Sequence, residues 1–428
     1  MARETIIVLA ILLMLIILLV THVVPYGVSA MLSCVLLVFT GVFDLETAFS
    51  GLSSSTTVMV ASMMVIAAAL GKTSIIHRLR KRLMSFQGKN GMLLMILIFL
   101  FTAVLSQFMG QTACIMLILL FVQSLDDEND MSPVRMLFCV AVINTVMTSR
   151  LPIGMGAAFP GMINSFYQGM VDESQLIGMW DYCKAGLIPS IVAVLYCIFA
   201  YRLLPTGQKL DTAQMQQVKE QQAIPKRDEI IIFSVFLAVT LGFMGQNIWG
   251  SDISNTIPAA AVLVLIFTKV FTVKEVLASL TSDMVWMVAG MQVMSSALGS
   301  SGVGELIGNG VLSILGENPS GWLVITVFCI VTTLITNFMS NTGTMALMTP
   351  IAASTALAGG FNVQTIVLVV NVSAWLAFAF PTGSSATMLA FGIGRFNPLK
   401  TLKFTLPLLV LCCASLILSI NLFFPIFV

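Results

Sequence analysis

Residues 321–350 read GWLVITVFCIVTTLITNFMSNTGTMALMTP, two apolar arms joined by the polar run Ser340–Thr344. The arms, Trp322–Ile335 and Met345–Leu357, can pair as a helical hairpin, but neither reaches the ~20 apolar residues of a full crossing. The polar tip is therefore expected at membrane depth, where irregular backbone is tolerated only against protein or a water-filled cavity. A binding site and an ordinary Ser/Asn/Gly turn both explain such a tip, and the rest of the chain decides between them.

The composition is that of a polytopic membrane protein. Of 428 residues, 58% are hydrophobic and only 9% are charged, and the mean hydropathy is +1.01. The net charge of +1 favours no charged partner such as nucleic acid. Residues 5–20 could pass for a signal peptide, but no small-residue cleavage site follows, so we interpret them as a first span. The eight cysteines are scattered through apolar segments without a CxxC pair, which predicts no metal cofactor and no disulfide framework.

The apolar runs predict two halves and a linker. The first half, residues 1–204, is expected to have spans at 5–21, 26–43 and 56–71, a hairpin at 92–122, a broken span at 134–168 and a span at 185–204. A polar linker occupies 205–229. The second half, residues 230–428, is expected to have spans at 230–247, 256–271 and 284–299, a hairpin at 321–357, a broken span at 363–396 and a span at 403–427.

The basic residues orient this map. If the loop 72–90 is cytoplasmic, that face receives 17 of the 20 Lys and Arg residues, including those of the linker 205–229. Arg3 and Lys184 fall on the other face, and Arg150 alone lies inside the membrane. The chain is therefore predicted to be a multi-pass protein of the inner (plasma) membrane with a cytoplasmic linker.

The two halves resemble each other at a separation of about 229 residues. Leu52–Gly71 aligned on Leu280–Gly299 gives ten identities in twenty positions, and the hairpins and breaks continue the match. Basic residues follow Gly71 but are absent from Gly299–Ser320, so the matched helices are expected to cross the membrane in opposite directions. Inverted repeats with paired interruptions are typical of secondary transporters whose site lies between the repeats.

Four polar interruptions are expected to meet near the membrane midplane. They are the first tip, 110–112; the second tip, 340–342; the first break, 148–156; and the second break, 381–387. Each precedes a helical segment, and converging helix N-termini form a pocket for negative charge. No Asp or Glu lies deep in a predicted span, which disfavours proton antiport and, for want of catalytic groups, an enzyme. Arg150 is interpreted as a charged anchor, because a charge at that depth costs about 2.5 kcal/mol or more.

The second half is similar to a known family. Ser340-Asn341-Thr342-Gly343-Thr344, followed by Pro350-Ile351, resembles the Ser-Asn-Thr hairpin motif of the divalent anion:sodium symporters, which are solute carrier 13-like di- and tricarboxylate carriers of the ion transporter superfamily. The segment Phe380–Ala386, with Phe391-Gly392 downstream, resembles that family's second broken-helix loop.

The resemblance implies an all-α homodimer that works as an elevator, with sodium as coupling ion. It implies that Ser340, Asn341, Thr382 and Gly383 bind sodium and that both tips contact the substrate carboxylates. Together with the charge argument, the predicted substrate-binding residues are Gln111, Thr112, Gly154, Arg150, Ser340, Asn341, Thr342 and Ser384.

The first half departs from the family pattern. Its tip reads Gly110-Gln111-Thr112 and its break carries Arg150, so reduced sodium stoichiometry or sodium-independent exchange is predicted. The sequence thus predicts a secondary active transporter of small di- or tricarboxylates by symport or exchange. A sulfate or other inorganic oxyanion transporter and an anion channel remain the alternatives.

Overall fold

The computed structural model describes residues 3–21, 23–73, 91–108, 110–122, 132–205, 224–244, 251–316 and 319–427. Most of the predicted linker 205–229 and of the basic loop 72–90 lies outside these residues. The described residues form α-helices and short 3-10 helices joined by turns and irregular segments, with an isolated bridge between Phe361 and Phe427. The prediction of an all-α protein is confirmed.

The first half consists of the following helices. They are α1 (Arg3–Thr21), α2 (Tyr26–Phe39), α3 (Leu45–Phe49), the 3-10 turn η1 (Ser50–Ser53), α4 (Ser55–Gly71), α6 (Gly91–Leu105), α7 (Gln111–Val122), α8 (Pro133–Met147), η3 (Gly154–Ala157), α9 (Phe159–Ser165) and α10 (Asp181–Ala200). Helices α6 and α7 are the arms of the first hairpin. Helices α8 and α9 flank the first break.

The second half has α11 (Lys226–Met244), α13 (Ser251–Phe267), α14 (Val273–Leu280), α15 (Asp283–Ser300), α16 (Val303–Leu315), α17 (Gly321–Thr336), α18 (Asn341–Gly359), α19 (Val363–Ser373), α20 (Ser385–Ile393) and α21 (Pro398–Phe423). Helices α17 and α18 are the arms of the second hairpin, and α19 and α20 flank the second break. Serine N-caps begin both arms, because Ser320 and Ser340 accept from the N–H groups of Leu323 and Gly343.

Within the described residues, four helical segments are long and apolar enough to cross a membrane: Arg3–Thr21, Leu45–Leu70, Asp181–Leu203 and Pro398–Phe423. The bent pair of α14 and α15 gives a fifth. Most of the remaining apolar helices have 10–17 residues, which suits half-length hairpin arms and interrupted spans.

The sequence map differs from the structure in two ways. The expected span 26–43 contains a helix that already ends at Phe39, where the chain turns through Gly41 at a φ of +73°. Helices α3, α14 and α16 were not predicted. Helix α16 has a signal in the sequence, because its apolar residues recur on one face, but the helix is too short for a membrane span.

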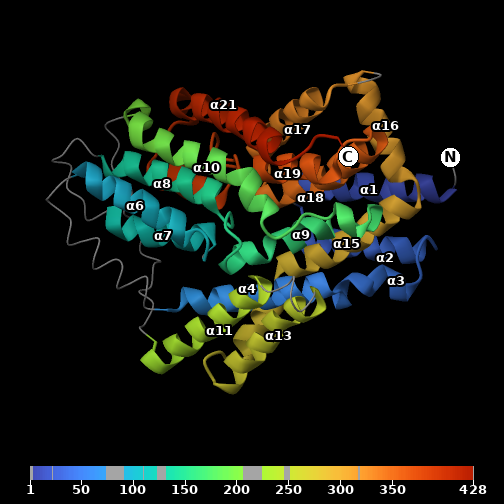
Figure 1. The fold of residues 1–428 in the computed structure, drawn as a ribbon, viewed down its shortest axis with the longest axis horizontal. Coiled ribbons are helices and arrows are strands. Elements are labelled where there is room, and N and C mark those ends of the chain that lie inside the picture. The colour runs from blue at the N-terminus through green and yellow to red at the C-terminus, as the bar shows by residue number, and fades with distance from the viewer. Residues whose placement is uncertain are drawn as a thin grey trace.

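Helices from the two halves interleave. Helix α2 packs on α15, and α4 packs on α13. Along α15 the contacts run backwards, since Gly51 lies against Ala289 whereas Met64 lies against Ser282. The matched segments 52–71 and 280–299 are therefore antiparallel, as inverted repeats require. Figure 1 shows α10 beside α21 along one edge and α4, α11 and α13 along the opposite edge.

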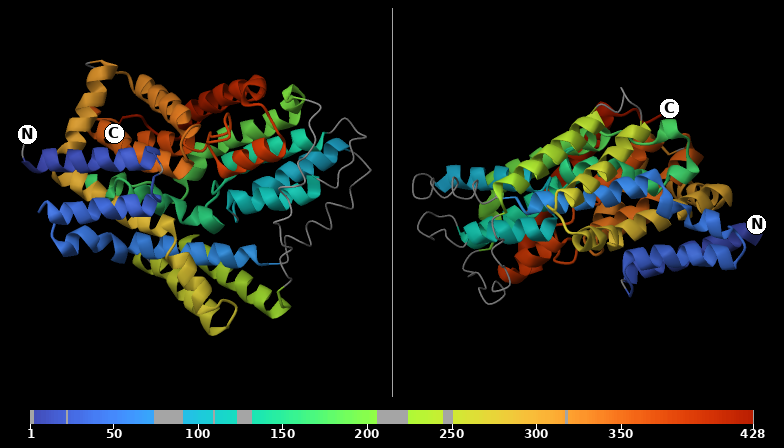
Figure 2. Two further views of the ribbon diagram at one scale, coloured as in Figure 1. Left: turned by 180° about the vertical axis from the view of Figure 1, so that it is seen from behind. Right: turned by 90° about the horizontal axis from the view of Figure 1, so that it is seen from below.

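The buried apolar residues form two cores that both draw on each half. One core joins α6, α7, α8 and α10 to α20 and α21, and the other joins α1, α2, α4 and α9 to α15, α18 and α19. Helix α20 of the second half thus packs against α7 and α8 of the first (Figure 2). This exchange brings the second break close to the first hairpin.

Candidate functional site

The second hairpin tip is tied to the second break through Asn337. Its Nδ2 donates to Leu376 O (3.0 Å), and its Oδ1 accepts from Ala379 N (2.8 Å). Thr382 Oγ1 donates to the carbonyl of Asn337 (2.8 Å). The tip and the break therefore form one hydrogen-bonded unit.

Oxygen atoms converge beside this unit, at the start of α18. Thr336 Oγ1 donates to Ala374 O (2.6 Å), and one carboxamide atom of Asn341 lies 2.9 Å from Gly383 O and 3.3 Å from Ala374 O. That atom is the amide nitrogen, because an oxygen there would face only acceptors. Gly383 permits this approach, since a Cβ at that position would lie 3.0 Å from Thr336 O. The predicted residues Asn341 and Gly383 thus meet.

The first tip is tied to the first break in the same manner, through Gln107. Its Nε2 donates to Met147 O (2.7 Å), and its Oε1 accepts from Leu151 N (2.9 Å). Gly154 lies against this tip at a φ of +59°, and a Cβ there would be 2.5 Å from Gln107 O. Glycine is therefore required at position 154 for this close approach, and it could contact a ligand only through its backbone.

Gln111 connects the first tip to the second break. Its side chain is half-buried, and its Oε1 accepts from Ser385 Oγ (3.3 Å), while its carbonyl accepts from Asn144 Nδ2 (2.8 Å). Because Asn341 contacts Gly383 and Gln111 contacts Ser385, the two tips approach one three-residue segment of the second break. Thr112 is exposed beside Gln111.

Two of the predicted hydroxyl groups, those of Ser340 and Ser384, serve as helix caps. Ser340 caps α18, and its Oγ also lies 2.5 Å from Tyr26 Oη on α2. Ser384 caps α20 and is hydrogen-bonded to Thr145 Oγ1 of α8 (3.0 Å). Thr342 is half-buried at the start of α18. These caps leave the helix N-termini of α18 and α20 beside the second break.

Arg150 is buried, with 1% of its surface exposed, but its guanidinium is directed at α10 rather than at the first tip. Nε and Nη2 donate to Val146 O (3.3 and 2.9 Å), and the guanidinium lies 4.7 Å from the centre of the Tyr182 ring. Gly186 leaves room for it, since a Cβ there would lie 2.2 Å from Nη1. Arg150 was predicted as a charged anchor for the substrate, whereas in the structure its guanidinium caps the carbonyl end of α8.

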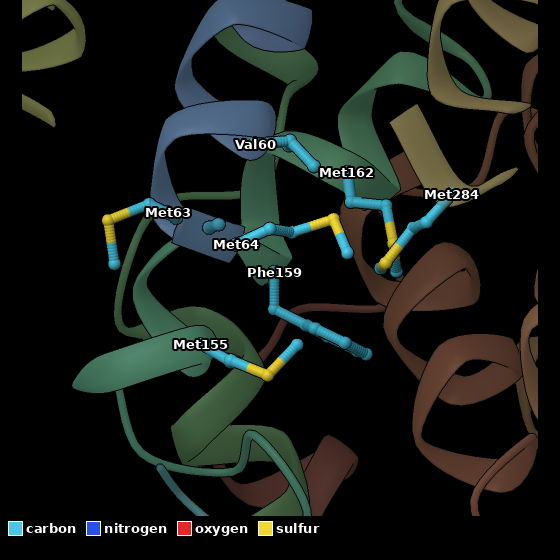
Figure 3. A pocket seen from close by; sticks show the side chains of 8 residues that line it. Val60, Met63, Met64, Met155, Phe159, Met162 and Met284 are labelled. Atoms are coloured by element: carbon cyan, nitrogen blue, oxygen red, sulfur yellow. The ribbon is translucent and has the colours of Figure 1, made fainter. Parts of the chain in front are cut away.

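An apolar pocket lies beside the first break. Figure 3 shows its lining, from α4, η3, α9 and α15: Val60, Met63, Met64, Met155, Ala158, Phe159, Met162 and Met284. Thioether and hydrocarbon groups offer no donors to an anion, so this pocket is not a carboxylate site. A cavity of about 410 Å³ between α15, α16 and α18 contains none of the predicted site residues.

Sequence reasoning left four of the contacting residues out of the predicted site residues. Gln107, Asn337, Tyr26 and Ser385 all bond to predicted site elements. Gln107 and Asn337 stand at matched positions of the two halves, so the repeat itself held their signal. Tyr26 gave none, because it comes from a distant span.

A helical membrane fold with paired hairpins, paired breaks and interleaved halves defines the class of secondary transporters. Within that class, the family described as Citrate transporter (CitMHS) matches residues 14–372 and, in a second match, 247–428. The chain belongs to this family and is a multi-pass membrane transporter.

Relatives of full length agree. An "Uncharacterized transporter" of Haemophilus influenzae is 22% identical over 412 residues, which cover 90% of this chain and 84% of the relative. The "Sodium-dependent dicarboxylate transporter SdcS" of Staphylococcus saprophyticus is 22% identical over 413 residues, covering 88% of this chain and 78% of the relative. The resemblance to the divalent anion:sodium symporters is confirmed.

A solved structure shares the fold. The YdaH transporter of Alcanivorax borkumensis superposes with a TM-score of 0.63 at 14% identity and covers 99% of both chains. At this identity the likeness concerns the fold alone.

Proposed function

We propose that this protein is a secondary active transporter of small di- and tricarboxylate anions in the cytoplasmic membrane, coupled to sodium through a site in its second half. The observation that carries the proposal is the meeting of both hairpin tips at Gly383–Ser385. The family description and the dicarboxylate transporter among the relatives favour carboxylates as the substrate class.

Helix N-termini supply the anion recognition. Helices α7, α18 and α20 begin at Gln111, Asn341 and Ser385, the residues that meet at the second break. Their free N–H groups and positive dipole ends favour a carboxylate, and the Gln111 amide and the exposed Thr112 hydroxyl add donors. We assign substrate contact to Gln111, Thr112, Thr342 and Ser385.

The second half has the oxygen atoms for a sodium ion. If the Asn341 carboxamide turns over, its Oδ1 joins Gly383 O, Ala374 O and Thr336 Oγ1 around one point. Unwound backbone carbonyls of this kind coordinate sodium in transporters with broken helices. Of the predicted ligands, Asn341 and Gly383 fit this site, whereas the Ser340 and Thr382 hydroxyls are directed at Tyr26 and Asn337 O.

Among the described residues of the first half, the counterparts of Asn341 and Thr336 form no equivalent cluster. Gln111, the counterpart of Asn341, bonds to Ser385 instead of to its own break. Ser106, the counterpart of Thr336, donates locally to Ala103 O (2.8 Å). This asymmetry supports coupling to fewer sodium ions than two complete sites would give.

The interleaved, antiparallel halves support alternating access, for which we propose an elevator mechanism; the homodimer is proposed from the family resemblance alone. The contact of Tyr26 on α2 with Ser340 at the second tip then joins a scaffold helix to the moving hairpin. Sodium and substrate shift the equilibrium between the two facing states by binding them unequally.

Uptake into proteoliposomes tests the proposal. We expect succinate or citrate uptake that rises with sodium along a curve of low cooperativity, and Asn341→Leu is expected to lose the sodium response. Uptake that depends on internal dicarboxylate but not on sodium would show an exchanger. Uptake of sulfate alone would show an oxyanion carrier, and single-channel currents would show a channel.

A further inference from the structure

The bonds of Gln107 and Asn337 are the same in kind. Those of the amide nitrogens are also in register, whereas the N–H partners of the two oxygens, Leu151 and Ala379, are shifted by one residue. Gln107 and Asn337 are 230 residues apart, and their carbonyl partners Met147 and Leu376 are 229 apart, as the repeats require. In each case the amide nitrogen also donates to the carbonyl four residues earlier, Ala103 O (2.8 Å) or Thr333 O (2.7 Å). Two unrelated side chains would not reproduce donor, acceptor and register together.

Both carboxamides are buried and fully used. Gln107 is 1% exposed and Asn337 is 3% exposed. Each side-chain NH₂ group donates to two backbone carbonyls, that of Gln107 also to Ser106 Oγ (3.2 Å), and each side-chain oxygen accepts one backbone N–H of the break. A broken helix leaves peptide groups without partners, which is costly where water is absent. The carboxamides satisfy those groups.

We propose that Gln107 and Asn337 are equivalent positioning residues, each of which fastens a hairpin tip to its own break so that the two move as one body. Neither residue is assigned to the substrate or to the cation. Asn337 holds the loop that carries Ala374 O and Gly383 O, and Gln107 holds the tip that carries Gln111. We call the hydrogen bonds of each of these two carboxamides a clamp. Loss of one clamp would loosen one break without directly removing a group that binds substrate or sodium.

Hydrogen–deuterium exchange on the purified full-length protein tests this without any transport measurement. In Asn337→Ala, residues 374–384 are expected to exchange about tenfold faster while residues 147–156 keep their rate, because only one clamp is lost. Gln107→Ala is expected to give the reverse pattern. Asn421→Ala is the matched control, since Asn421 Nδ2 donates only to Ile417 O of its own helix (2.7 Å), and neither segment is expected to change.

Variants that change only the length of the side chain allow the same test if an alanine variant fails to fold. Asn337→Gln and Gln107→Asn retain donor and acceptor but misplace them, so each is expected to raise exchange at its own break by less than the alanine variant. Equal changes at both breaks, or none at either, would overturn the proposal.

A second readout rests on the proposed function. Asn337→Ala is expected to raise the sodium concentration for half-maximal uptake about tenfold, with little change in the uptake rate at saturating sodium. Gln107→Ala is expected to change the substrate concentration for half-maximal uptake instead. If the exchange pattern appears but no sodium effect is seen, the clamp stands and the sodium site does not. If uptake responds as expected but exchange does not, the clamp is refuted.

Discussion

At the scale of single residues, the site depends on atoms that are absent as much as on those present. Gly154, Gly186 and Gly383 each leave space that a Cβ would fill, against Gln107 O, the Arg150 guanidinium and Thr336 O. Such close approaches let backbone and tips share hydrogen bonds at membrane depth. Substitution of one of these glycines by alanine therefore tests whether the close approach is needed.

Gly154→Ala is expected to destabilise the protein by about 3 kcal/mol, because it combines strain at positive φ with a clash against a backbone carbonyl. Gly41→Ala is the control, since Gly41 has a φ of +73° but no atom within 4 Å of the added Cβ, and a loss of about 1 kcal/mol is expected. Thermal unfolding of both variants in the same detergent measures the difference. Equal losses would mean that the contact with Gln107 contributes nothing.

At the scale of elements, the second hairpin is joined to α16 by small residues. A Cβ at Gly308 would lie 2.2 Å from Ser354 O on α18, so the two helix backbones are nearly in contact. Gly304 and Gly308 form the GxxxG spacing that permits such packing in membranes. Helices α16 and α18 are therefore packed backbone to backbone.

Gly308→Ala is expected to separate α16 from α18, lower stability by about 1–3 kcal/mol and slow transport. Gly310→Ala on the same helix is the control, because nothing lies within 4 Å of its added Cβ and alanine favours the helix. Unfolding temperature and initial uptake rate, measured side by side, check the pair. A Gly308→Ala variant as stable as Gly310→Ala would rule out close packing here.

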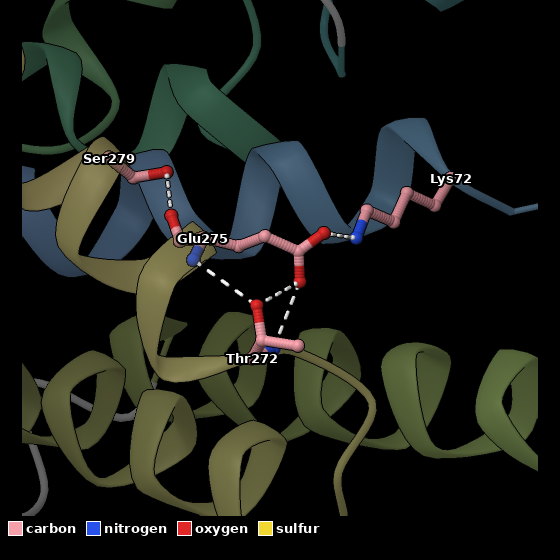
Figure 4. A network of polar contacts seen from close by, with 4 residues as sticks. All are labelled: Lys72, Thr272, Glu275 and Ser279. Atoms are coloured by element: carbon pink, nitrogen blue, oxygen red, sulfur yellow. Dashed lines mark hydrogen bonds and ion pairs between the residues drawn. The ribbon is translucent and has the colours of Figure 1, made fainter.

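At the scale of the whole molecule, the two halves are joined by polar contacts of unequal strength. Asp283 at the start of α15 accepts from the N–H groups of Tyr26 (3.1 Å) and Gly27 (2.8 Å), so it caps α2 of the other half. Pro25, the residue at the N-cap of α2, provides no side-chain cap. Figure 4 shows the other link, in which Lys72 of α4 pairs with Glu275 of α14, and Thr272 completes a capping box with Glu275.

Asp283→Ala is expected to cost about 1–2 kcal/mol, because two N–H groups lose their cap. Glu275→Gln is expected to cost less than about 1 kcal/mol, because the side chains of the pair are 34% and 41% exposed and solvent screens them. Unfolding at low and high salt checks this, since the Lys72–Glu275 contribution is expected to fall with salt. The reverse order of the two losses would contradict the assignment.

The sequence by itself determined the all-helical membrane class, the hairpins, the breaks and the family. Those follow from apolar run length, polar interruptions and internal similarity, which are local properties of the chain. Only the tertiary structure decided that Arg150 turns to Tyr182, that Gln111 meets Ser385 and that Gln107 and Asn337 hold the breaks. A side chain's direction depends on which backbone groups, distant in sequence, lack hydrogen-bond partners in the fold. The spacing of residues along the chain does not show which groups these are.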